Sequence, residues 1–204
     1  MRRGPQHGAR LLLIGPPGAG KGTQAVRLAE AYQVPAVSTG DIFRSNVANA
    51  TELGNKAKAY MDVGDNVPDE LTNALIRDRL AEADCTGGFL LDGYPRTADQ
   101  VRELDEFLTG HHASLNAVVE LVADPEVVVE RIRVRAAQEG RSDDDDTVVR
   151  HRLDVYREQT EPLVEIYRDR GLLVEIDALG SIDEVTARIT DALAARGIVT
   201  PANA

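Results

Sequence analysis

The stretch that most constrains the fold is a glycine-rich loop near the start of the chain. It follows a short apolar run and reads L-L-L-I-G-P-P-G-A-G-K-G-T over residues Leu11–Thr23. The run Leu11–Ile14 is too short and too apolar for a surface helix, and Gly-Pro-Pro ends it, so we expect a buried parallel strand. Glycines leave the main chain uncovered and adopt angles closed to other residues, so several N–H groups can converge on one anion.

A lysine and a threonine strengthen the prediction that this loop binds phosphate. Lys21 opens a helical pattern, where the helix dipole favours negative charge and the ammonium can reach outer phosphates. The general pattern places Ser or Thr directly after the lysine, whereas here Gly22 intervenes and the hydroxyl comes at Thr23. A plain glycine-rich turn would share some of these features. The ordered glycines, the lysine and the strand-then-helix context favour phosphate binding.

Composition narrows the class of protein. A chain of 204 residues suits one domain, with or without insertions. Its net charge of −11 argues against a nucleic-acid-coating surface. The single cysteine, Cys85, excludes an internal disulfide and a multi-cysteine metal cluster, and it fits a reducing compartment. We expect a cytoplasmic protein without membrane spans or a secretory signal, and a flexible tail over residues 1–9.

Periodicity predicts strands that alternate with helices. Further strands are expected at residues 34–37, 89–91, 116–122 and 172–177. Helices are expected at residues 21–32, 41–48, 52–61, 69–81, 98–108, 125 to about 138, 147 to about 170 and 182–195, with Pro162 ending or kinking the seventh. The three helices between residues 41 and 81 are interpreted as an insertion. The alternation implies a parallel sheet covered on both faces, with ligands at the carboxyl ends of its strands.

Two other segments reach the same edge of the sheet. Asp92 ends an apolar strand, where an acid that holds Mg²⁺ is expected beside a phosphate loop, although a strand-ending turn residue would look the same. Thr39 and Arg44 follow the second strand and could bind a base and a phosphate. Ser38 or Thr39 could equally cap the next helix, and the two roles are compatible.

Arginines flank a polar loop at residues 140–146. Arg131, Arg133 and Arg135 precede the loop, Arg141 lies in it, and Arg150 and Arg152 follow it. They are either the cationic side of a flap that closes on phosphates or the ion-pair partners of the aspartates at 143–146. The spacing does not decide between these two interpretations.

Several segments together resemble the adenylate kinase family of the short-lid type, from Leu11 to about Ala195. They are G-P-P-G-A-G-K-G-T-Q from Gly15, S-T-G-D-I-F-R from Ser38, G-F-L-L-D-G-Y-P-R from Gly88 with Gln100, R-S-D-D from Arg141, and R-L-D-V-Y-R-E-Q-T-E-P-L from Arg152. The resemblance implies an α/β phosphate-loop NTPase fold with a five-stranded parallel sheet in the order 2-3-1-4-5, flanked by helices. It also implies a single domain at residues 10–198, with a core (10–37, 68–135, 153–198), an AMP-binding insertion (38–67) and a lid (136–152).

The resemblance also implies roles for individual residues in a reversible, Mg²⁺-dependent phosphoryl transfer from ATP to AMP. The catalytic residues would be Lys21, Arg96, Arg135, Arg141 and Arg152. ATP would be held by Gly18, Ala19, Gly20, Lys21, Gly22, Thr23, Arg131, Arg135 and Gly180. AMP would be held by Thr39, Arg44, Asp65, Asn66, Val67, Gly93, Tyr94, Pro95, Arg96, Gln100, Arg141 and Arg152. Asp92 would hold Mg²⁺ through water, and the family expectation is a monomer.

The sequence departs from the family pattern in its lid and in the AMP loop. A-A-Q-E-G between Arg135 and Arg141 is longer than expected, which loosens the register of Arg141, and the absence of lid cysteines excludes zinc. Asn66 stands where an aliphatic residue is usual. An anionic phosphate acceptor needs no general base, so no histidine is given a catalytic role and surface positions are expected for all of them.

Two other functions are compatible with the same motifs. A UMP/CMP kinase is built from the same parts, although Gln100 and Thr39 favour adenine because an amide can pair with its donor–acceptor edge. A non-enzymatic nucleotide switch would need a guanine-reading segment, and Asn55–Lys58 lacks the expected aspartate at its end.

Overall fold

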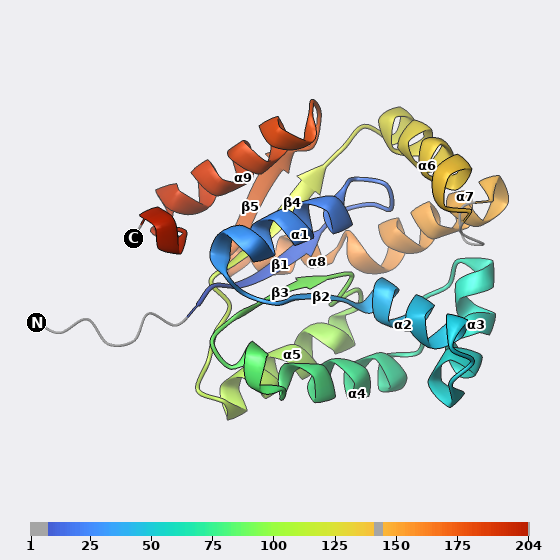
Figure 1. Ribbon diagram of the computed structural model, residues 1–204, viewed down its shortest axis with the longest axis horizontal. Helices are drawn as coiled ribbons and strands as arrows, with labels where there is room; N and C mark the ends of the chain where they lie inside the picture. Colours follow the sequence, from blue (N-terminus) through green and yellow to red (C-terminus); the bar gives the residue numbers. More distant parts are fainter. Residues whose placement is uncertain (1–7, 141–144, 204) are drawn as a thin grey trace, which may run out of the picture.

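The fold is built on one five-stranded parallel sheet. The computed structural model describes residues 8–140 and 145–203 (Figure 1). The strands are β1 (Arg10–Ile14), β2 (Ala36–Ser38), β3 (Phe89–Asp92), β4 (Ala117–Val122) and β5 (Leu173–Asp177), paired in the order β2-β3-β1-β4-β5. The predicted sheet and its strand order are confirmed. Residues 1–7 of the expected tail lie outside the described residues.

Helices cover both faces of the sheet, as a parallel sheet requires. Leu11 and Leu13 of β1 pack with α1 (Lys21–Tyr32) and α9 (Ile182–Ala195). Leu12 and Ile14 pack against the opposite layer of α4 (Asp69–Leu80), α5 (Ala98–Gly110) and α8 (Leu163–Asp169). Alternate residues of the buried strand therefore belong to two separate cores.

A small arm follows β2. Helices α2 (Thr39–Ala48) and α3 (Glu52–Val63) share a minor core of Phe43, Ala57 and Val67. The next helix, α4, packs in both directions: Leu71 and Leu75 contact this minor core, whereas Ile76 and Leu80 are buried in the core that α5 and α8 share.

A second arm, α6 (Pro125–Glu139) and α7 (Asp146–Val155), follows β4 and has its own cluster of Val128, Ile132 and Val149. The two arms lie at the same end of the sheet (Figure 1).

The helix expected from 147 to about 170 is broken earlier than Pro162. It comprises α7, a π-helical turn at Tyr156–Thr160, and α8. Pro162 has no N–H to donate to the carbonyl four residues earlier. Glu161 instead donates to Tyr156 O, five residues back, at 2.9 Å. The wider turn also lets the Thr160 hydroxyl donate to Arg96 O at 2.9 Å.

The second strand also begins later than predicted. Gln33 ends α1 in the left-handed region (φ 54°), and Val34 N–H donates to Ala29 O at 3.0 Å. Val34 therefore completes the helix end and does not join the sheet.

Short 3₁₀ turns occur at Ala83–Cys85 and Pro201–Asn203. No helix in the described part of the chain has the length and apolar character needed to cross a lipid bilayer.

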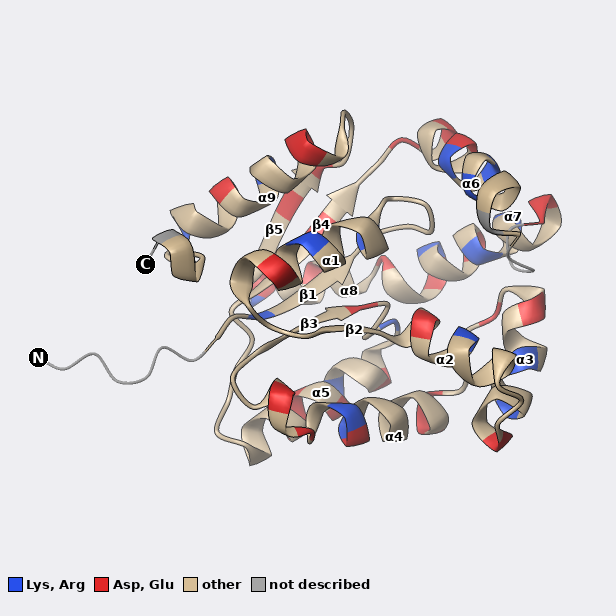
Figure 2. Cartoon of the chain, viewed as in Figure 1, with Lys and Arg blue, Asp and Glu red and all other residues tan. Residues whose placement is uncertain are grey.

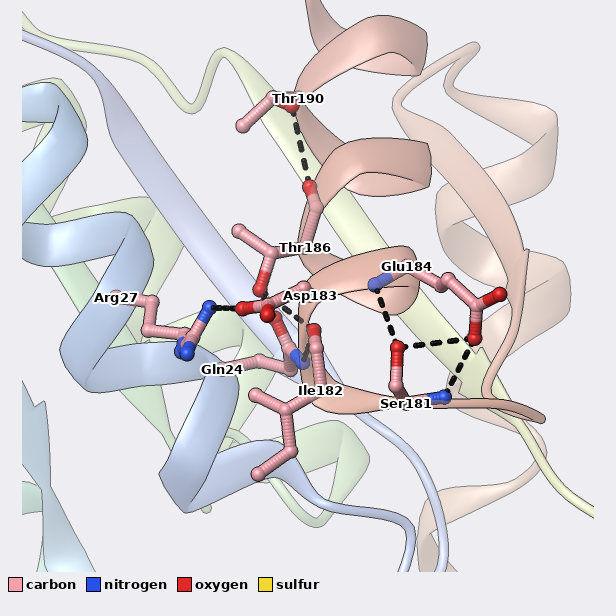
Figure 3. A network of polar contacts seen from close by, with 8 residues as sticks. All are labelled: Gln24, Arg27, Ser181, Ile182, Asp183, Glu184, Thr186 and Thr190. Carbon is pink, nitrogen blue, oxygen red and sulfur yellow. Dashed lines mark hydrogen bonds and ion pairs between the residues drawn. The ribbon is translucent and has the colours of Figure 1, made fainter.

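A polar network docks α9 onto α1 (Figure 3). Ser181 and Glu184 form a reciprocal capping box at the start of α9. The amide of the buried Gln24 donates to Ile182 O at 3.1 Å and accepts from the Thr186 hydroxyl at 2.8 Å, while Arg27 pairs with Asp183. These contacts fix the loop before α9 beside the phosphate-loop helix.

Replacing Gly54 by alanine tests the contact between α2 and α3. In an ordinary helix this change favours folding by about 1 kcal/mol. Here the new methyl carbon would lie 2.1 Å from Asn46 O, so the helices would have to separate. We expect the free energy of unfolding in urea to fall by about 2 kcal/mol.

Gly87→Ala is the matched control, because an added methyl there meets no atom within 4 Å. Its unfolding free energy should stay within about 0.5 kcal/mol of wild type. An unchanged or raised stability of the Gly54 variant would contradict the packing described for the arm.

Candidate functional site

The phosphate loop lies between the end of β1 and the start of α1. Gly20 precedes the helix in the left-handed region (φ 95°), without a side-chain cap, so the first N–H groups of α1 are left for a ligand. Gly18 has φ 82°, and a β-carbon there would meet Val128 O at 2.9 Å. Glycine at this position therefore allows both the turn and the close approach of α6.

The Lys21 ammonium is folded back onto the loop. Its Nζ donates to Gly15 O at 2.8 Å and to Pro16 O at 3.0 Å. Burial lowers the pKa of Lys21 from 10.5 to about 8; Asp92 opposes this shift, and Arg96, Arg152 and Arg135 add to it. The site is therefore short of negative charge, which a bound phosphate would supply.

Asp92 is the acid at the end of β3. Its side chain is nine-tenths buried, which raises its pKa, while nearby Lys21 and Arg96 act in the opposite direction. None of the described residues donates a hydrogen bond to its carboxylate, and no group of three or more His, Cys, Asp or Glu side chains among them could hold a metal. This carboxylate lies beside the phosphate loop, since a β-carbon added at Gly22 would be 3.8 Å from Asp92 Oδ2. One carboxylate there suits Mg²⁺, which usually keeps several waters and takes phosphate oxygens as ligands.

Two adjoining pockets meet above this loop. One has a volume of about 790 Å³, within the range of small-molecule sites, and lies between the phosphate loop, α6 and the start of α9. The other lies between the loop, the α2–α3 arm and the π-helical turn. The two pockets share seven of their lining residues: Pro17, Lys21, Gly40, Arg44, Gly93, Arg96 and Arg152. Basic segments lie among acidic ones on α2, α6 and α7 around this end of the sheet (Figure 2).

The pocket beside the α2–α3 arm is organised around Gly93 O. This carbonyl accepts from the Thr39 hydroxyl at 2.9 Å and from Arg96 Nε at 2.8 Å. Ser38 caps α2 by accepting from Asp41 N–H at 3.3 Å, so Ser38 and not Thr39 is the helix cap. Thr39 is thereby directed to the β3 loop. Arg44 pairs with Asp41 at the rim.

The Gln100 amide is engaged with protein partners on both sides. Its Oε1 accepts from Arg96 N–H at 2.7 Å, and its Nε2 donates to Asp69 Oδ1 at 2.7 Å. The side chain is 1% exposed. A base bound here would use the second lone pair or the second amide hydrogen of Gln100.

The larger pocket is bridged by Arg131. Its guanidinium donates to Ala19 O at 3.3 Å and to Ala178 O at 2.7 Å, which ties the phosphate loop to the segment after β5. Arg135, one turn further along α6, lines the same pocket together with Gly180. Gly180 has φ 102°, and a β-carbon there would meet Glu184 Oε2 at 2.6 Å, so this turn requires glycine.

The structure brings together nearly all the site residues expected from the sequence. The larger pocket is lined by Gly18–Thr23, Asp92, Arg131, Arg135 and Gly180. The other is lined by Thr39, Arg44, Asp65–Val67, Gly93, Pro95, Arg96, Gln100 and Arg152. Tyr94 lines neither pocket: it is 1% exposed in the core, and its hydroxyl donates to Asn73 Oδ1 at 2.8 Å. Arg141 and the aspartates at 143 and 144 lie outside the described residues.

Other residues at the site escaped the sequence analysis. Phe43, Met61, Tyr156 and Thr160 also line the smaller pocket. Phe43 and Met61 are core-type residues of the arm, so apolar periodicity gave no reason to place them at a ligand. Tyr156 and Thr160 belong to the π-helical turn, whose register ordinary helical spacing does not predict.

Comparison with known proteins gives one consistent match. A family model described as "Adenylate kinase" matches residues 13–172. A protein of Thermobifida fusca (strain YX) named "Adenylate kinase" is 59% identical over 187 residues, which cover 92% of this chain and 99% of the relative. One of Leifsonia xyli subsp. xyli (strain CTCB07) with the same name is 57% identical over 189 residues, or 93% of this chain and 95% of the relative.

The lowered pKa of Lys21 predicts a pH-dependent stability. Between about pH 8 and 10.5 the unfolded chain binds more protons at this site than the folded chain, so wild type gains stability there as pH rises. Lys21→Met removes this group. We expect its unfolding free energy, relative to wild type, to fall by about 2 kcal/mol across that range, after allowance for solvent screening. Urea unfolding of both proteins from about pH 7 to 10.5 measures it, and parallel pH curves would contradict the pKa assigned to Lys21.

Proposed function

The chain belongs to the adenylate kinase family, and we propose that its two adjoining pockets divide the two nucleotides of that family's reaction between them. The reaction transfers a phosphoryl group from ATP to AMP and gives two ADP. The observation that carries the division is that both pockets are lined by Lys21, Arg96 and Arg152. Phosphates entering from the two sides would therefore meet beside the same cations.

The larger pocket is proposed to hold ATP. Main-chain N–H groups of Gly18–Thr23 would bind its phosphates at the start of α1. Arg131 and Gly180 would both lie near the adenine base, while Arg135 would face the phosphates. Support comes from the cavity's volume and from the contacts of Arg131, which join the phosphate loop at Ala19 to the segment after β5 at Ala178.

The smaller pocket is proposed to hold AMP. Thr39, Gly93, Pro95, Gln100 and the loop Asp65–Val67 would surround the nucleoside. The cations directed to its phosphate would be Arg44, Arg96 and Arg152, together with Arg141 as the family resemblance implies. The engaged Gln100 amide supports adenine selection, because its orientation is set before any base arrives.

Catalysis is proposed to rest on alignment and charge. The acceptor oxygen of AMP is already anionic, so no side chain has to remove a proton. Lys21, Arg96, Arg135 and Arg152 would stabilise the charge that spreads over the transferring group, together with Arg141. The lid at residues 136–152 would exclude water, which would otherwise accept the phosphoryl group.

Mg²⁺ is proposed to accompany ATP, where it would neutralise phosphate charge. Asp92 would hold it through water. The supporting observation is the buried carboxylate at the end of β3, to which none of the described residues donates a hydrogen bond. We also propose that the enzyme acts as a cytoplasmic monomer, since one chain supplies both pockets and its single cysteine fits a reducing compartment.

An acceptor panel tests the proposed division and the preference for adenine. With MgATP as donor, kcat/KM for AMP should exceed that for UMP, CMP or GMP by about 100-fold or more, because an amide set for one base leaves unpaired groups against another. Coupled assays of ADP formation measure each acceptor. Equal use of UMP or CMP would assign the smaller pocket to a pyrimidine. Steady ATP hydrolysis without any acceptor would contradict phosphoryl transfer between two nucleotides.

Removing the charge at Lys21 tests the proposed catalytic centre. Lys21→Met should lower kcat for ADP formation by a factor of hundreds or more, because one group that stabilises transition-state charge is lost. Circular dichroism should show an intact fold. Arg27→Ala, which breaks only the exposed pair with Asp183, is the control and should retain activity within about threefold. Near-normal turnover of the Lys21 variant would refute the assignment.

A further inference from the structure

One side chain of the α3–α4 loop makes direct contact with Arg96. Asn66 Oδ1 accepts from Arg96 Nη1 at 3.1 Å, and Asn66 Nδ2 donates to Gln159 Oε1 at 2.8 Å. Because a guanidinium can only donate, the amide oxygen of Asn66 must face Arg96 and its nitrogen must face Gln159. The chain of hydrogen bonds therefore has one direction, from Arg96 through Asn66 to Gln159.

The same arginine is held at two other points. Its Nε donates to Gly93 O at 2.8 Å, and its own carbonyl accepts from the Thr160 hydroxyl at 2.9 Å. Gly93 therefore fixes the inner end of the guanidinium, and Asn66 fixes an outer nitrogen. Gln159 and Thr160 are consecutive residues of the π-helical turn, so that one turn supports Arg96 along two routes.

We propose that Asn66, supported by Gln159, is a positioning residue that sets the plane of the Arg96 guanidinium between the two pockets. The inference rests on the role proposed above for Arg96 and extends it to two residues outside the catalytic set. An amide suits this task because it holds the guanidinium without neutralising it. A carboxylate in its place would compete with the substrate phosphate for the same cation.

A purely structural role for this loop makes a different prediction. The neighbouring Asp65 Oδ1 lies 2.6 Å from His151 Nε2 of α7, so the loop is also joined to the second arm without involving Arg96. If loop docking alone mattered, breaking this pair would act like the loss of the Asn66 amide. His151→Ala is therefore a control at the same contact surface.

Steady-state kinetics of the full chain with MgATP and AMP separate the two roles. Asn66→Leu keeps the side-chain size and removes both hydrogen bonds, and it should lower kcat about tenfold, because small misplacements of a catalytic group are costly. KM for ATP should change less than about twofold, as should all constants of His151→Ala. Gln159→Met should lower kcat in the same direction, whereas Gln159→Glu keeps an acceptor for Asn66 and should remain within about twofold of wild type.

A double-variant test asks whether Asn66 acts through Arg96. In an Arg96→Lys background, Asn66→Leu should add less than about a twofold loss, because the guanidinium that it orients is absent. The proposal is overturned if Asn66→Leu stays within twofold of wild type, if its full effect persists beside Arg96→Lys, or if His151→Ala reproduces it.

A spectroscopic measurement keeps this inference separable from the proposed function. The Arg96 Nε–H resonance, identified by its absence in Arg96→Lys, should be sharp in wild type and broadened in Asn66→Leu without nucleotide. An unchanged resonance would overturn the positioning role even if the enzyme is active. Loss of AMP phosphorylation in wild type, with the resonance behaving as expected, would instead refute the reaction assignment alone.

Discussion

The structure depends on the gathering of positive charge at the carboxyl end of the sheet. Lys21, Arg96, Arg135 and Arg152 come from different elements. Burial, and to a smaller extent the three arginines, lowers the pKa of Lys21 to about 8. Asp92 offsets part of this charge. Such an arrangement is costly in a low-dielectric pocket and is relieved when phosphates bind. The charge distribution of the fold therefore favours the binding of polyanions at this site.

The sheet provides the rigid platform that keeps those charges together. Strand order places β3 and β4 on either side of β1, so the phosphate loop lies centrally between the two arms. The arm after β2 and the arm after β4 each have a small core separate from the two main ones. In the proposed division, the two nucleotides would therefore approach one centre from opposite sides, each beside its own arm.

Local sequence patterns were enough to predict much of the fold and of the candidate site. The features that the sequence analysis missed depend on contacts between residues far apart in the chain. The phosphate loop and α9 were predicted within their observed bounds because their signals, ordered glycines and an apolar periodicity, are contained in a few residues. The break at Tyr156 depends on a proline and on a hydroxyl contact 64 residues away. The contacts of Asn66 join it to residues 30 and 93 positions distant, and no spacing rule links them. The burial of the Tyr94 side chain in the core could not be predicted either, because membership of a motif does not say which way a side chain points.

The backbone contact at Gly54 has a mechanical consequence. With no side chain between them, α2 and α3 touch main chain to main chain and have little freedom to slide or bend relative to each other. Any swing of this pair must then be taken up where it is tethered, next to β2 and around Pro68 ahead of α4. Closure around an acceptor nucleotide would be a rigid-body rotation of α2 and α3 about the two short segments that connect them to the rest of the fold. The extent of this rotation would be set by those segments and not by bending of the helices.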